Sequence, residues 1–264
     1  MRDAVRARSL EGSITLPFPP TMPAMPAFRD ALQQVLKSLE NAAAQAERPT
    51  PRLLAVAKTQ PVASVRALAE AGQRAFGENY VQEGVAKIRA LADLGLEWHL
   101  IGHLQSNKCR DVARHFDWLQ TLDRLRLVAP LDRERAGHPH PLQVLIQVNP
   151  DGEAGKSGCD PDAIESLAAA VATAPNLRLR GLMAIPEPHP DEAVRRATFR
   201  RLRGWFEALQ AAHPGVDTLS MGMSGDYALA IEEGATMVRI GTAIFGARAP
   251  AAEASPCKWG GSAR

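Results

Sequence analysis

A single lysine ends the apolar run in "LLAVAKTQP", residues 53–61, and its position raises a chemical question. A charged ammonium is costly in a segment built for burial, so Lys58 either extends its stem toward water or has a chemical role. Desolvation favours the neutral, nucleophilic form of an amine. Such an amine forms Schiff bases with aldehydes, so the stretch permits covalent capture of a carbonyl compound. The alternative is a solvated lysine, or one paired with a carboxylate.

Hydroxyl groups and glycines near the end of the chain could hold a phosphate. In "SMGMSGDYALAIEEGATMVRIGTAIFG", residues 220–246, Ser224 lies between glycines, and Gly241 and Thr242 follow an apolar run. Glycines allow backbone N–H groups to approach a phosphate closely, and a helix N-terminus attracts the anion. Ser224 is also a suitable N-cap for a helix beginning near Asp226. Capping alone would explain the serine equally well.

Arg239 is a charged residue within the apolar segment "TMVRIGTAIFG". An unpaired guanidinium in such a place would be strongly destabilising, so the side chain requires a buried acceptor. That acceptor is either a carboxylate on a neighbouring strand or a heteroatom of a ligand. The sequence leaves both open.

The segments that must position these residues alternate between strand-like and helix-like patterns. Strands are predicted at 52–58, 74–79, 97–102, 118–123, 143–149, 180–185, 218–223 and 238–246. Amphipathic helices are predicted at 61–72, 80–95, 104–116, 161–174 and 192–212, and another at 29–46 precedes the first strand. Eight strands separated by crossover segments predict an α/β fold, a single (β/α)8 TIM barrel with an extra N-terminal helix. An open doubly wound sheet is the alternative.

Active sites of such barrels lie where the strands end, so the residue at or just after each strand is a candidate. These residues are Lys58, Asn79, His103, Asp123, Asn149, Pro186, Ser224 and the Gly241/Thr242 pair. Asn79 suits either a ligand oxygen or its own turn. His99 lies within a strand among apolar neighbours, where a histidine is more often part of the core than catalytic.

The loop "GEAGKSG", residues 152–158, resembles a phosphate-binding loop but departs from that pattern. Pro150 stands where the pattern requires glycine, and proline has no N–H to donate. We interpret the segment as a mobile loop from which Lys156 reaches over the barrel mouth.

Composition narrows the function classes. The 264 residues are 45% hydrophobic and 23% charged, with a formal net charge of +2, which favours neither nucleic acid nor an anionic membrane. No apolar stretch approaches the length of a membrane span. We expect residues 1–26 to form a disordered leader, residues 27–248 the barrel, and residues 249–264 an unstructured tail. Three scattered cysteines indicate a reducing compartment and neither a disulfide framework nor a metal site.

The motifs together resemble those of the pyridoxal phosphate homeostasis proteins, the YggS/PROSC-like family. The resemblance rests on "LLAVAKTQP", "FGENYVQEGVAKI", "EWHLIGHLQSNK", "VNPDGEAGKSG", "RGLMAIPEP" and the segment 220–248, in order from about residue 28 to residue 248. It implies a barrel similar to that of fold-type III pyridoxal 5′-phosphate (PLP) enzymes, such as the alanine racemase N-terminal domain. By position, it implies these roles: Lys58 carries PLP as a Schiff base, Ser224, Gly241 and Thr242 surround the phosphate, Arg239 faces the pyridine nitrogen, and Asn79, His99 and Met183 line the ring pocket.

The resemblance implies intracellular PLP homeostasis in the cytoplasm, by a monomer that supplies PLP-requiring apoenzymes. An arginine against the pyridine nitrogen disfavours its protonation and weakens the cofactor as an electron sink, so we expect binding without catalysis. A PLP-dependent amino-acid racemase or decarboxylase is the alternative, and a Schiff-base aldolase is the second. His103 departs from the family, in which we expect proline, so ligand access at that loop could differ.

Overall fold

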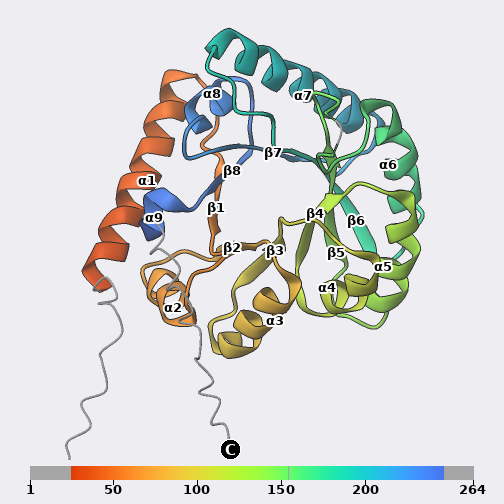
Figure 1. The fold of residues 1–264 in the computed structure, drawn as a ribbon, viewed down its shortest axis with the longest axis horizontal. Helices are drawn as coiled ribbons and strands as arrows, with labels where there is room; N and C mark the ends of the chain where they lie inside the picture. The colour runs from red at the N-terminus through yellow and green to blue at the C-terminus, as the bar shows by residue number, and fades with distance from the viewer. Residues whose placement is uncertain (1–24, 154, 247–264) are drawn as a thin grey trace, which may run out of the picture.

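Eight parallel strands close into a barrel in sequence order, β1 pairing with β8 (Figure 1). The computed structural model describes residues 25–153 and 155–246. The strands are β1 (Arg52–Val56), β2 (Ala75–Glu78), β3 (Glu97–Leu100), β4 (Trp118–Leu122), β5 (Leu142–Val148), β6 (Leu177–Ala184), β7 (Thr218–Met223) and β8 (Met237–Ile240). The predicted (β/α)8 barrel is confirmed, and the open-sheet alternative is excluded by the β1–β8 pairing.

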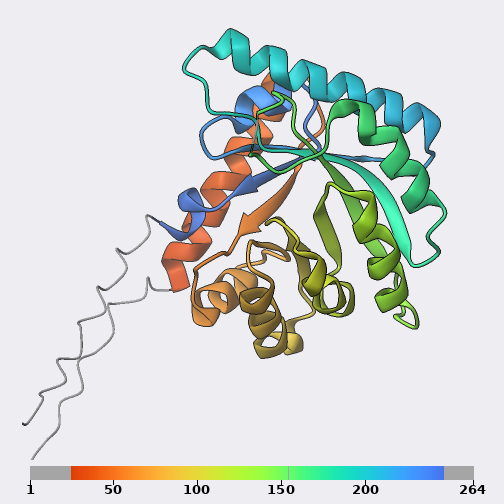
Figure 2. The same cartoon turned by 45° about the vertical axis from the view of Figure 1, so that its right-hand side comes forward.

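Helices surround the barrel and cover the outward side chains of the strands (Figure 1). The α-helices are α1 (Met25–Gln45), α2 (Val62–Glu70), α3 (Val81–Ala90), α4 (Cys109–His115), α5 (Val128–Arg135), α6 (Ile164–Ala172), α7 (Glu192–Ala212), α8 (Tyr227–Glu232) and α9 (Thr242–Phe245). Short 3-10 helices are η1 (Ala92–Leu94), η2 (Ser106–Lys108), η3 (Leu125–Leu127) and η4 (Pro161–Ala163). The extra helix α1 packs against α2, α8 and α9 (Figure 2).

The alternation of side chains along each strand divides the core into two parts. Outward residues such as Phe76 and Leu100 belong to one large cluster beneath the helices. Inside the barrel, apolar packing is confined to two small clusters, one around Leu54 and Met237 and one that joins Trp118 to Met183. The rest of the interior carries buried polar side chains that require partners.

The last strand is shorter than predicted. β8 ends at Ile240, and the segment that follows forms α9 instead of continuing the strand to residue 246. Ile244 and Phe245 are both buried, and the ring of Phe245 meets Phe28 of α1 edge to face at 6.1 Å. This apolar contact with α1 favours a helical turn, because an extended segment would direct alternate residues away from it.

Two other predictions differ from the structure. The sequence patterns do not predict α5, because Pro130 lies in its first turn and its apolar residues are few; burial of Val128 and Leu131 supplies the packing. Helix α1 begins at Met25, so the last two residues of the predicted leader are helical. The remainder of the leader and the tail lie outside the described residues.

Within the described ranges, no helix is both long and apolar enough to cross a membrane. The same residues contain no cluster of histidine, cysteine and acidic side chains that could hold a metal ion. Cys109 and Cys159 are buried free thiols.

We predict that Gly102→Ala destabilises the barrel mouth. A Cβ at this position would lie 2.0 Å from the backbone oxygen of Asn79, so the β2 end would have to shift. Overpacking of this kind costs about 1–3 kcal/mol in the free energy of unfolding, which urea denaturation measures. The matched control is Gly204→Ala in α7, where no atom lies within 4 Å; it should gain about 0.5–1 kcal/mol. Equal changes in the free energy of unfolding for the two variants would contradict the close approach of Gly102 to the Asn79 backbone.

Candidate functional site

Lys58 lies at the barrel mouth, two residues beyond the end of β1, in a turn. The register pairs Val56 with Gly77, so Lys58 and Asn79 leave adjacent strands at the same level. The Lys58 side chain is half-buried, and its Nζ makes no hydrogen bond or ion pair with any described residue. The paired alternative from the sequence is therefore not seen, and the amine is available for a ligand.

A different lysine, Lys87 of α3, satisfies every bond its ammonium can donate. Its Nζ donates to the backbone oxygen of Ala57 at 2.6 Å, to Glu78 Oε1 at 2.8 Å and to Glu83 Oε1 at 2.7 Å. The side chain is 5% exposed. Because three acceptors surround it, this ammonium fixes the residue that precedes Lys58 and has no donor left for chemistry.

The residue after Lys58 is held in a strained conformation. Thr59 has φ +63°, a left-handed value that is an outlier for a β-branched residue. Its N–H donates to Glu83 Oε1 at 2.6 Å, the same carboxylate that accepts from Lys87. The peptide is thus held on both sides of Lys58, and the strain is stored at the residue adjacent to the free amine.

Glu78, at the end of β2, completes this buried group. Burial raises the pKa of the Glu78 carboxyl to about 7, because desolvation outweighs the hydrogen bond and charge of Lys87. Its Oε2 is buried without a hydrogen-bond partner among the described residues. We name Glu78, Glu83 and Lys87 the buried triad.

Arg239 finds its acceptors in the backbone of neighbouring strands. Nη1 donates to the backbone oxygen and to Oγ of Ser220, at 2.8 and 2.7 Å, and Nη2 donates to the backbone oxygen of Ala184 at 2.7 Å. No carboxylate of the described residues forms a salt bridge with the guanidinium. Burial lowers the pKa of Arg239 to about 10, with Asp226 opposing this shift, so the group is charged at neutral pH.

The predicted phosphate residues leave adjacent strands. Register pairs Met223 of β7 with Arg239 of β8, so Ser224 and Gly241 follow neighbouring strand ends. The side chains of Ser224 and Thr242 are exposed, and their hydroxyls make no hydrogen bond to the residues that the structure describes.

The prediction that Ser224 caps the next helix is wrong. The N-cap of α8 is Asp226, and residues 224–226 form a turn that precedes the helix. Asp226 Oδ1 accepts from the N–H of Met223 at 2.6 Å, which closes this turn. Because Asp226 supplies the acceptor that closes the turn, the Ser224 hydroxyl stays free at the tip of the turn.

Asn79 lines a cavity of about 320 Å³ at the mouth, together with Gly102, His103, Gln147 and Ser157. Asn79 Oδ1 and Gln147 Oε1 are buried atoms that lack a hydrogen-bond partner within the described residues. His103 Nδ1 lies 3.2 Å from Ser157 Oγ, so His103 links two loops that line this cavity.

His99 and Met183 lie deeper, inside the barrel, and both are fully buried. Met183 packs against Trp118 and Leu145. The His99 ring stacks on Trp118 at 5.0 Å between centroids, and hydrogen bonds engage both of its nitrogens. The structure thus brings Lys58, Asn79, Ser224, Gly241 and Thr242 to the rim and leaves these two side chains below it.

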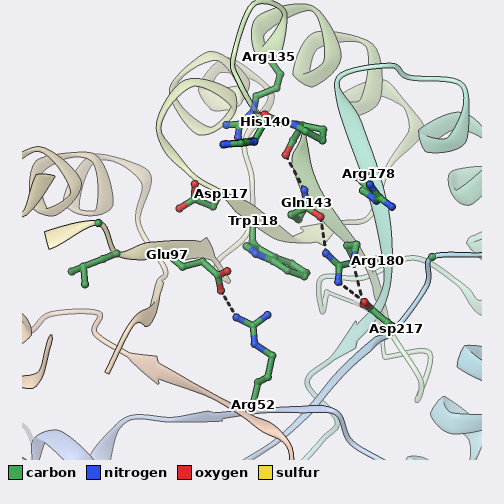
Figure 3. Close-up of a pocket in the computed structure, with 14 residues that line it drawn as sticks. Arg52, Glu97, Asp117, Trp118, Arg135, His140, Gln143, Arg178, Arg180 and Asp217 are labelled. Atoms are coloured by element: carbon green, nitrogen blue, oxygen red, sulfur yellow. Dashed lines mark hydrogen bonds and ion pairs between the residues drawn. The ribbon is translucent and has the colours of Figure 1, made fainter. Parts of the chain in front are cut away.

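A second cavity, of about 710 Å³, lies on the opposite, N-terminal face (Figure 3). It is lined by Arg52, Glu97 and Trp118, which are the first residues of their strands. Asp217, which precedes β7, also lines it. It contains none of the predicted site residues.

The buried triad, Gln120, Gln147 and Ser220 were missed by the analysis of the sequence. A signal for some of them exists, because Glu78 in "RAFGEN" and Gln120 in "WLQTLD" are polar residues within predicted strands. Like Arg239, each of these side chains must find a buried partner.

We predict that Lys87→Met lowers the free energy of unfolding by about 3–5 kcal/mol, because it leaves two carboxylates without their shared partner. Urea denaturation of the purified protein without added ligand measures this. Lys37→Met, a matched change on the exposed face of α1, should stay within about 0.5 kcal/mol. Adding Glu78→Gln to Lys87→Met should restore part of the loss. A loss no larger than that of the Lys37 variant would contradict the assigned contacts.

Glu78 should also make stability depend on pH. Its folded pKa of about 7 lies above the ordinary value of 4.5, so its contribution is fully present below pH 4.5 and is lost as pH rises toward 7. The loss amounts to at most about 3 kcal/mol. Unfolding of the wild type and Glu78→Gln, compared from pH 4 to pH 8, should give curves that diverge across this window. Parallel curves would show that Glu78 does not titrate there.

Comparisons with known proteins show which proteins the chain is similar to. The family model of the alanine racemase N-terminal domain matches residues 29–249. A pyridoxal phosphate homeostasis protein of Pseudomonas aeruginosa is 52% identical over 233 residues, covering 88% of this chain and 100% of that protein. The Escherichia coli K12 protein of the same name is 54% identical over 199 residues, covering 74% and 85%.

Solved structures show the same likeness. PipY of Synechococcus elongatus, in a structure described as having PLP bound, superposes with a TM-score of 0.73 at 36% identity, covering 83% of this chain and all of that one. Alanine racemase of Corynebacterium glutamicum has a TM-score of 0.59 at 19% identity, over 84% of this chain and 62% of the enzyme, which concerns the fold alone. The resemblance inferred from the motifs is confirmed: the chain belongs to the alanine racemase N-terminal domain family and, within it, to the pyridoxal phosphate homeostasis proteins.

Proposed function

We propose that this protein binds PLP as a Schiff base on Lys58 and serves intracellular PLP homeostasis as a carrier. The observation that carries the proposal is the free, half-buried amine of Lys58 at the mouth of the barrel, on a backbone that Lys87 holds at Ala57 and Glu83 holds at Thr59. PLP supplies an aldehyde, and its condensation with the amine releases one water. The homologues named for PLP homeostasis and the PLP-bound PipY structure support the choice of this ligand.

The residues around Lys58 fit the parts of PLP. Ser224 and Thr242 offer unengaged hydroxyls at adjacent strand ends, which suit a phosphate. A Cβ on Gly241 would lie 3.2 Å from the Val56 backbone oxygen, so only glycine leaves this wall uncrowded. The buried Oδ1 of Asn79 has no partner among the described residues, as expected of an atom that meets a ligand.

Arg239 determines what kind of PLP site this is. We assign its guanidinium to the pyridine nitrogen, with Met183 and His99 beneath the ring. A permanent cation there disfavours protonation of that nitrogen, so the site holds the aldehyde and gives little help to carbanion chemistry. We therefore propose a carrier, not a racemase or decarboxylase.

The proposal extends to the recipients of PLP, the oligomeric state and the cellular compartment of the carrier. The mouth cavity beside Asn79 gives an amine of an apoenzyme a path to the bound aldehyde, so PLP-requiring apoenzymes are the proposed recipients. We place a monomer in the cytoplasm, where thiols stay reduced, which agrees with the two buried free cysteines.

Lys58→Ala should abolish the visible absorption band of PLP-loaded protein, because Lys58 is the lysine that follows β1 beside the strand ends of Asn79 and Gly241. The protein is incubated with PLP, freed of unbound ligand by gel filtration, and its spectrum recorded. The matched control is Lys108→Ala, which removes another lysine beside the mouth and should leave the band intact.

A band that persists in Lys58→Ala, or that disappears in Lys108→Ala alone, would contradict the assignment. The same preparations test the alternatives. A wild type that forms no band but cleaves phosphorylated sugars would support the aldolase. Deuterium uptake at the α-carbon of an amino acid that depends on Lys58 would show catalysis and overturn the carrier proposal.

A further inference from the structure

A continuous line of hydrogen bonds crosses the interior of the barrel from its N-terminal face to Arg239. Glu97 Oε1 lies 2.7 Å from His99 Nε2, and His99 Nδ1 lies 2.9 Å from Gln120 Nε2. Ser220 Oγ donates to Gln120 Oε1 at 2.8 Å and accepts from Arg239 Nη1 at 2.7 Å. We name these five residues the axial chain.

The direction of the bonds from Glu97 to Ser220 follows from the acidic end of the axial chain. A carboxylate only accepts, so His99 Nε2 must carry the proton that it shares with Glu97. The neutral ring then accepts at Nδ1, which orients the Gln120 amide with its nitrogen toward His99. Its oxygen is left to accept from Ser220, whose lone pairs face Arg239. The carboxylate of Glu97 therefore sets the donors and acceptors as far as Ser220, and the donor-only guanidinium of Arg239 favours the same direction from the other end.

The ionisation of the end groups agrees with this direction. Burial by itself would raise the pKa of Glu97, but His99 and Arg52 together lower it to about 2, so the carboxyl is charged at neutral pH. Burial lowers the pKa of His99 and keeps the ring neutral, against the opposite influence of Glu97.

The two ends of the chain lie at opposite faces of the barrel. Glu97 begins β3 and contacts Arg52 in the large N-terminal cavity, where Figure 3 shows the pair beside Trp118. Arg239 instead donates to Ala184, the last residue of β6, at the level of the mouth. The three residues between them are at most 1% exposed. Barrel interiors are usually filled by branched apolar side chains, so a polar line of this length requires a reason.

We propose that the axial chain is a positioning device, in which Glu97 at the N-terminal face orients the Arg239 guanidinium toward the PLP ring. This inference rests on the proposed function. His99, beneath the ring, then acts on Arg239 through Gln120 and Ser220. Replacing Glu97 by glutamine removes the polarity, because an amide can donate or accept, and both His99 tautomers become possible.

The experiment compares two isosteric changes in the same cavity. Glu97→Gln alters the end of the axial chain. Asp217→Asn also removes a carboxylate from the N-terminal face, where it pairs with Arg180 and does not contact the chain. We expect Glu97→Gln to weaken PLP binding about 3- to 10-fold and to shift the absorption maximum, with Asp217→Asn within about twofold of the wild type.

A second measurement needs no PLP. In ¹⁵N NMR of the unloaded protein, the His99 ring should be protonated at Nε2 alone in the wild type and in Asp217→Asn, and at either nitrogen in Glu97→Gln. Gln120→Met, which cuts the chain at its centre, should weaken PLP binding at least as much as Glu97→Gln. Thermal unfolding of each variant checks that it is folded.

The outcomes separate this inference from the proposed function. A wild type that does not bind PLP overturns the carrier, and the tautomer of His99 still decides the direction of the chain. A wild type that binds PLP, with Glu97→Gln unchanged or with both isosteric variants weakened equally, overturns the positioning role alone. An Nδ1-protonated His99 in the wild type overturns it as well.

Discussion

A full positive charge inside a closed barrel is the constraint on which this structure depends. Arg239 is 3% exposed, and its guanidinium needs acceptors that the apolar layers cannot provide. Two neighbouring strands provide them, through the carbonyl of Ala184 at the end of β6 and that of Ser220 within β7. The hydroxyl of Ser220 in turn engages Gln120. The polar interior of the barrel is thus a consequence of placing one arginine beneath the mouth.

The same physical requirement distinguishes two lysines. Lys87 is buried and gives its three donors to Ala57 and two carboxylates, whereas Lys58 lies only a residue from that carbonyl and has no partner in the described part of the chain. Burial with full pairing makes the first structural. Partial exposure without pairing leaves the second able to react. Lys87 therefore supports Lys58 by fixing the backbone at Ala57, the residue that precedes Lys58.

In the function that we propose, these arrangements form a site that restrains an aldehyde more than it exploits one. The rim offers hydroxyls and a glycine wall for a phosphate, and a free amine for the carbonyl carbon. The cation below it opposes electron withdrawal through a pyridine nitrogen. A carrier needs retention and access, and the cavity bounded by Asn79 and His103 gives access at the side of the mouth.

The sequence by itself determined the eight strands, the place of Lys58 at a strand end and the need of Arg239 for an acceptor, because these follow from local periodicity and from the cost of burying charge. Only the tertiary structure decided which acceptor: Ala184 lies 55 residues from Arg239, and Ser220 lies 100 residues from Gln120. Barrel closure brings these residues together, and nothing in their local segments records it. The helix that follows β8 likewise depends on packing against α1. The N-cap of α8 depends on a hydrogen bond within the turn that precedes the helix. In both places these contacts override the local sequence pattern.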